Sequence, residues 1–125
     1  QVADPETFAA LNSRLDALVV EAGRAPAAVR RTVILPVLVQ RTAADLDRHI
    51  AALQQHAPPF SQASPAAIKD WLSGLKGIIG SPQQIVDGLA EYAARGAEEI
   101  ILEWFGLHDL EGLELLGSEI LPHFR

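Results

Sequence analysis

The 125-residue sequence contains no cysteine and no methionine, and each absence is informative. Without cysteine the chain forms no disulfide, uses no thiolate in catalysis and holds no cysteine-ligated zinc. A natural open reading frame begins with methionine, so the start at Gln1 predicts a processed, trimmed or deliberately cut chain. Basic residues are also few: the chain has ten Lys and Arg and sixteen Asp and Glu, which gives a net charge of −6. With no run of Lys or Arg, this balance argues against binding to a nucleic-acid backbone.

Long apolar runs are absent as well. No segment approaches the ~20 apolar residues that span a bilayer, and the chain does not open with a signal-peptide pattern. We therefore predict a cytoplasmic protein with no membrane contact and no nucleic-acid partner. The length fits one domain, residues 1–125, with a core of modest size.

The most informative segment lies between Gly80 and Phe105. Ser81, followed by Pro82 and Gln84, has the pattern of a capping box with proline at the first helical position, and it predicts the start of a helix. A glycine at position 96 ends that helix. Residues 99–105 are then apolar at nearly every position, which predicts a strand buried on both faces. The segment is thus predicted to be one helix–glycine–strand unit of a parallel α/β protein.

The rest of the chain repeats this arrangement. Capping residues, prolines and apolar stripes predict helices from Asp4 to Gly23, from Thr42 to Pro58, from Ser64 through Leu72 and from Asp109 to Pro122, a helical turn from Pro26, a strand over residues 32–39 and a short strand between Gly74 and Gly80. Pro36 is unusual in a strand, because it donates no ladder hydrogen bond, and it favours a bulge or a fraying end. Gly112 and Gly117 weaken the last helix by about 1 kcal/mol each relative to alanine.

Strands that alternate with helices predict an α/β fold with parallel strands and right-handed crossovers. Three strands are few, since a TIM barrel needs eight strands and ~250 residues, so the chain holds about half of one.

Three blocks of the sequence carry a family resemblance: residues 22–47, 78–105 and 109–124. In this order they resemble the C-terminal part of the luciferase-like monooxygenase family, whose barrels use reduced flavin or the related deazaflavin coenzyme. The resemblance implies a partial (half) TIM barrel made of the last three strands, with residues 56–77 in the position of the family's insertion. The first five strands, which in the family carry much of the flavin-holding surface and the catalytic polar residues, are missing, so no catalytic residue is carried over. The resemblance implies a C-terminal fragment without turnover of its own, from an oxidoreductase that uses FMN or deazaflavin on a small organic substrate.

Four residues are candidates for a binding site. Gly80 and Ser81 lie at a helix start after a predicted strand, where free amides and the helix dipole favour an anion; the alternative is a plain N-cap. Glu103 and Phe105 lie at the end of the last predicted strand, on the face where barrels build their active sites, and are expected to line a pocket. Their alternative is a solvated carboxylate with the aromatic ring in the core.

Histidine gives no further candidate. His49, His56, His108 and His123 share no metal-ligand spacing, so we predict no metal site, and His108 with Asp109 indicates helix capping.

A second hypothesis for the whole chain is a small stand-alone α/β interaction module. Open edges of a parallel sheet are pairing surfaces, so such a module is expected to self-associate into a homo-oligomer.

Overall fold

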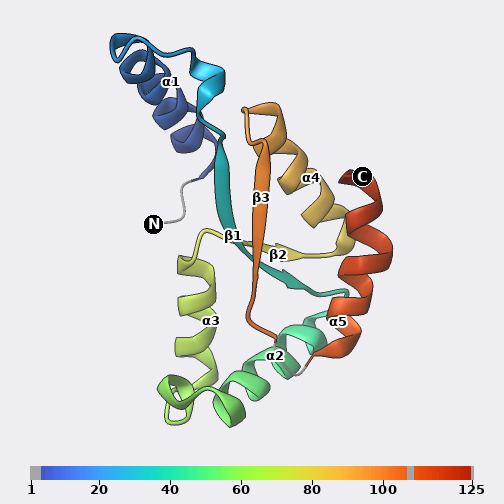
Figure 1. The fold of residues 1–125 in the computed structure, drawn as a ribbon. Helices are drawn as coiled ribbons and strands as arrows, with labels where there is room; N and C mark the ends of the chain where they lie inside the picture. Colours follow the sequence, from blue (N-terminus) through green and yellow to red (C-terminus); the bar gives the residue numbers. More distant parts are fainter. Residues whose placement is uncertain (1–3, 107–108, 125) are drawn as a thin grey trace.

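The computed structural model describes residues 4–106 and 109–124. Its helices are α1 (Pro5–Glu21), α2 (Ala43–His56), α3 (Pro65–Gly74), α4 (Pro82–Ala94) and α5 (Leu110–Leu115), and its strands are β1 (Thr32–Val39), β2 (Ile78–Gly80) and β3 (Glu99–Trp104). Short 3₁₀ turns cover Pro26–Ala28 and Pro58–Phe60. The predicted α/β alternation is confirmed (Figure 1).

Local capping chemistry sets the helix boundaries. The side chains of Asp4, Thr42 and Ser81 each accept a hydrogen bond from a first-turn amide, and the last two form complete capping boxes. Gly23 and Gly96 follow α1 and α4 with φ of 73° and 95°, a conformation that residues with a Cβ rarely adopt. The predicted starts and ends of these helices are therefore confirmed.

The sheet has three parallel strands in the order β2-β1-β3. Val37 pairs with Ile78 of β2 on one side and with Trp104 of β3 on the other. Pro36 is tolerated in the central strand because pairing with β2 begins only at Val37. In a barrel each strand lies beside the next one along the chain, which would place β2 in the middle. The order observed places β1 there instead.

Helices cover both faces of this sheet. The odd-numbered residues of β1 pack on α4 and the C-terminal segment, in a core that includes Leu35, Ile85 and Ile120, all fully buried. Leu38 points to the opposite face, where it packs with α2 and α3 around Ile68. The segment 56–77 thus supplies α3 as a cover for the carboxyl half of that face.

The amino half of the same face has no such cover. Ile34 and Ile101 are 51% and 47% exposed, and Glu103 beside them is exposed too. The prediction that residues 99–105 are buried on both faces is therefore wrong for β3, whose burial alternates from residue to residue. Three strands and these helices do not supply enough apolar surface to cover both faces along their whole length.

The last helical segment also differs from the prediction of one helix. After α5 the backbone widens into a π-helical turn over Leu116–Ile120 and then tightens into a 3₁₀ turn over Leu121–Phe124, past Pro122. Leu116 and Ile120 are buried, whereas Leu110 is 70% exposed. Only the C-terminal part of the predicted apolar stripe contacts the core.

Candidate functional site

The connections of the sheet change direction between β1 and β3. From its carboxyl end β1 leads to α2 on one face, whereas β3 leads to α5 on the other. In open α/β sheets, ligands bind outside the carboxyl ends of the strands at such a switch point. The candidate site is therefore the region between the start of α2 and the start of α5.

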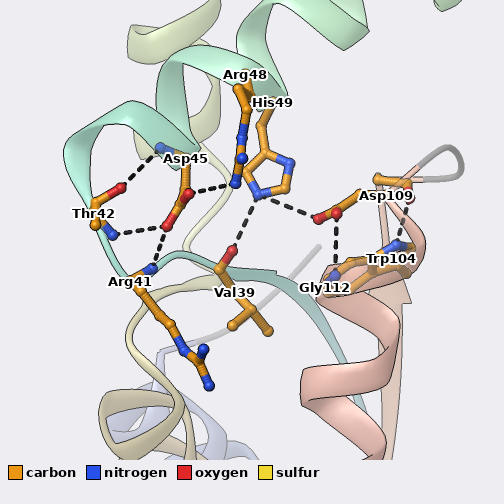
Figure 2. Close-up of polar contacts among 10 residues, drawn as sticks. Val39, Arg41, Thr42, Asp45, Arg48, His49, Trp104, Asp109 and Gly112 are labelled. Atoms are coloured by element: carbon orange, nitrogen blue, oxygen red, sulfur yellow. Dashed lines mark hydrogen bonds and ion pairs between the residues drawn. The ribbon is translucent and has the colours of Figure 1, made fainter.

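A histidine and an aspartate meet in this region. His49 of α2 is buried, with 7% of its surface exposed, and its Nε2 lies 3.0 Å from the carbonyl oxygen of Val39 at the end of β1. The same nitrogen lies 3.5 Å from Oδ2 of Asp109, while Oδ1 of Asp109 accepts a hydrogen bond from the Gly112 amide at 3.0 Å. Figure 2 shows that the second ring nitrogen of His49, Nδ1, is turned away from both oxygen atoms.

The contact with the Val39 carbonyl determines which ring nitrogen of neutral His49 carries the hydrogen. A carbonyl only accepts, so Nε2 of His49 carries the proton and donates it. Nδ1 is then the acceptor nitrogen of the ring. If the ring is protonated, the Asp109 carboxylate is its nearest counter-charge. The pair thus places a buried imidazole beside a carboxylate at the carboxyl edge of the sheet.

The N-terminus of α2 sets the position of His49. One carboxylate oxygen of Asp45 accepts from the amides of Arg41 and Thr42 at 2.7 and 2.8 Å, and Oγ1 of Thr42 accepts from the Asp45 amide (Figure 2). These backbone hydrogen bonds, that of Thr42 first, lower the pKa of Asp45, and the Coulombic attraction of Arg48 adds to them. The helix therefore starts at a fixed residue, and His49 falls on its sheet-facing side.

Two hollows share His49 and Asp109 in their walls. The first, of about 80 Å³, is mostly apolar, and Leu38, Leu53 and Phe105 are among the residues in its walls. The second, of about 200 Å³, has several polar and charged side chains in its walls, among them Arg41, Thr42, Asp45, Arg48 and Glu111. We call the two together the carboxyl-edge cleft. Its composition suits a small molecule with an apolar end and a polar end.

The structure separates the two residues predicted at the end of the last strand. Phe105 lies in the wall of the apolar hollow, and its ring packs edge-on against Trp71 of α3 at 5.5 Å. Glu103 lies on the same face of the sheet but in its uncovered half, and it is exposed. Phe105 therefore joins His49 and Asp109, while Glu103 stands apart from them.

Ser81 acts as an N-cap, the alternative weighed for it. Its hydroxyl accepts from the Gln84 amide at 3.3 Å, and its own amide donates to Oε1 of Gln84 at 2.9 Å. Gly80 is buried, and a Cβ there would lie 2.4 Å from that same oxygen. An anion at Gly80 and Ser81 has to displace the Gln84 side chain first. Glu119 lines the adjoining groove, where its carboxylate is paired with Arg41.

Metal-ligand spacing does not single out His49 in the sequence, although helical periodicity does indicate that it is buried. It falls within the apolar stripe of α2, between Leu46 and Leu53, where helical periodicity places a side chain on the buried face. Asp109 was predicted as a cap, which is confirmed, but its contact with His49 spans 60 positions and leaves no local pattern. The role predicted for His108 lies outside the described residues.

Two further properties concern only residues 4–106 and 109–124. No three His, Asp or Glu side chains there gather closely enough to hold a metal ion. No helix in these ranges has the length and apolar character needed to cross a bilayer.

No protein-family model matches the chain, and a search of curated proteins finds none that matches its sequence.

Proposed function

We propose that this chain is the C-terminal part of a luciferase-like oxidoreductase, which uses FMN or a deazaflavin coenzyme on a small organic substrate. One observation carries the proposal. Phe105, His49 and Asp109 converge at the carboxyl edge of a parallel sheet, the edge at which α/β enzymes bind their ligands. An aromatic ring and a proton-accepting imidazole are suitable neighbours for a flat redox coenzyme or its substrate.

The uncovered sheet face supports the same proposal. Ile34, Ile101 and Glu103 lie side by side on it with no helix over them, although two of the three are apolar. In the complete protein, the missing half would supply the segments that cover this part of the face. The proposal thus gives the exposed isoleucines a partner and places Glu103 inside.

The size of the cleft argues that the chain does not work alone. Its two hollows, of about 80 and 200 Å³, are each below the ~300–1,000 Å³ of small-molecule sites, so a three-ring flavin fits into neither. The chain supplies one wall of the proposed site, and the missing half supplies the others.

The test has two parts. In a fluorescence titration with oxidised and reduced FMN and with the deazaflavin coenzyme, we expect no saturable binding at concentrations on the order of tens of micromolar. In the natural reading frame we expect about five further strand–helix units upstream of Gln1, as a complete barrel requires. A frame without such units, or turnover by the chain alone, would overturn the proposal.

If binding does saturate, point variants decide whether this cleft is the site. Phe105→Ala should then weaken binding strongly, and Glu103→Gln and Ser81→Ala test the other two predicted contacts. Leu110→Ala is the matched control, because Leu110 is 70% exposed and lies outside the cleft walls. Equal binding by Phe105→Ala and by the control would place the ligand elsewhere.

The second candidate is a stand-alone α/β interaction module that self-associates, and the strand order favours it. The order β2-β1-β3, with helices on both faces, is that of an open doubly wound sheet. The barrel proposal requires β2 to lie between β1 and β3 in the complete protein. A reading frame that encodes little more than these residues, together with a concentration-dependent oligomer, would decide for the module.

A further inference from the structure

One side of α1 attaches this helix to the rest of the fold. Phe8 and Val19 are buried, and the Phe8 ring meets the Tyr92 ring of α4 at 6.0 Å in a T-shaped contact. On the same side, Nδ2 of Asn12 donates to the Arg95 carbonyl at 3.4 Å. The positions 8, 12 and 19 follow helical spacing, so α1 uses a single face for these contacts.

The neighbouring face of α1 is apolar and uncovered. It carries Leu11, Leu15, Leu18 and Ala22, which we call the α1 stripe. Leu11 and Leu18 are 54% and 52% exposed, Leu15 is half-buried and Ala22 is exposed. Figure 1 shows α1 at one end of the molecule, away from α2, α3 and α5. The stripe is therefore accessible to another protein.

Two opposite charges flank the stripe on its outer side. Arg14 and Glu21 are both exposed, and neither forms an ion pair within residues 4–106 and 109–124. They lie seven residues apart, which is two helical turns, so they are too distant to pair with each other along the helix. Each remains available to a charge on a partner.

The spacing of these residues is that of a heptad. Leu15 and Ala22 take position a, Leu11 and Leu18 take position d, and Arg14 and Glu21 take position g. When two such helices pack antiparallel about a two-fold axis, Leu15 meets Leu18 of the second copy, and each g position faces the other. Arg14 of each copy then lies opposite Glu21 of the other, so the dimer contains two such ion pairs and each charge has one partner.

A parallel pair lacks this match. Its g positions face the e positions of the partner helix, and the e position that follows Arg14 is Val19, which is already buried in its own chain. We propose that α1 forms an antiparallel, two-fold symmetric homodimer interface through the α1 stripe, with Arg14 paired to Glu21 across it. This interface is separate from the carboxyl-edge cleft, because no residue of the α1 stripe lies in the walls of either hollow.

The dimer is expected to be weak. Four stripe residues per copy, over roughly 16 Å of helix, form a contact well below the ~1,000 Å² of a stable interface. The monomer and dimer should therefore exchange, and their ratio should depend on concentration in the micromolar to millimolar range. Raising the salt concentration should shift the balance toward the monomer, because the two ion pairs are exposed.

Charge reversal and charge exchange provide the decisive experiment. In sedimentation equilibrium, Arg14→Glu and Glu21→Arg should each raise the dimer dissociation constant roughly tenfold, since each turns both attractions into repulsions. The double variant, Arg14→Glu with Glu21→Arg, restores opposite charges and should dimerise like the wild type. Circular dichroism confirms that each variant is folded.

Leucine variants test the apolar part of the interface. Leu18→Ala should abolish the dimer, whereas Leu110→Ala, which removes an even more exposed leucine on α5, should leave it unchanged. A wild-type chain that stays monomeric at every concentration would overturn the proposal. A dimer that ignores the α1 variants would also overturn it and would point to the open edges of β2 and β3.

Discussion

Gly112 and Gly117 make the sharpest stability prediction, because the same substitution at the two positions should act in opposite directions. A Cβ at Gly112 would lie 2.2 Å from Oδ2 of Asp109 and 2.8 Å from two carbons of the Trp104 ring. A Cβ at Gly117 would have no atom within 4 Å. The glycine in α5 thus makes room for the carboxylate that reaches His49, whereas the later one has no such role.

The magnitudes follow from these distances. Alanine raises helix stability by about 1 kcal/mol over glycine, so Gly117→Ala should raise the free energy of unfolding by about 0.5–1 kcal/mol. At Gly112 the same gain is opposed by overpacking against the Trp104 ring, at about 1–3 kcal/mol, and by disturbance of the Asp109 cap, at about 1 kcal/mol. Gly112→Ala should therefore lower the free energy of unfolding by about 1–3 kcal/mol.

Urea unfolding followed by tryptophan fluorescence and circular dichroism measures both effects. The midpoints should move in opposite directions while the m-values stay the same. In an Asp109→Ala background the cost of Gly112→Ala should shrink, because the closest clashing atom has been removed. If Gly112→Ala is as stable as Gly117→Ala, the packing of Asp109 and Trp104 around α5 described above is wrong.

Two further substitutions test the start of α2 and the start of β2. Hydrogen bonds from the amides of Thr42 and of the residue before it lower the pKa of Asp45 below 3.8 in the folded state, so their stabilisation is present above that pH and is lost as the pH falls through the folded pKa. Asp45→Asn should thus lower the urea midpoint at neutral pH, and the midpoints of variant and wild type should converge in acid. An equal lowering at both pH values would contradict the role given to the Asp45 carboxylate. Gly77→Ala would place a Cβ 2.4 Å from the Pro36 carbonyl oxygen, so it should lower the melting temperature, whereas Gly74→Ala, with no atom within 4 Å, should not; equal melting temperatures would contradict the close approach.

Local chemistry made the elements predictable from the sequence. Ser81 and Gln84 cap each other within one helical turn, and Gly96 ends the same helix with a positive φ, so neither feature depends on distant residues. The existence of β3 was predictable too, from its apolar run, although its burial on both faces was not. Such signals are complete within a few residues of the chain.

The arrangement of these elements was not predictable in the same way. Ile34 and Ile101 are as apolar as any core residue, and the sequence does not say that the sheet has too few neighbours to cover them. The candidate site, too, could be predicted from the sequence only in part. Phe105 follows a predicted strand, so its place at the carboxyl edge has a local signal, whereas His49 and Asp109 come together only because β1 and β3 are adjacent.

The central position of β1 has a consequence for folding. Its first partner, β2, begins at Ile78, and the hydrogen bond between Thr32 and Glu99 joins β1 to β3 across 67 positions. On the ribosome, the most apolar segment of the chain is therefore made early and stays unpaired until most of the protein has been synthesised. We expect this to slow folding and to expose a strand that is prone to aggregate. Pro36 interrupts that strand, and a proline within an apolar run discourages pairing with other copies while the proper neighbours are still missing.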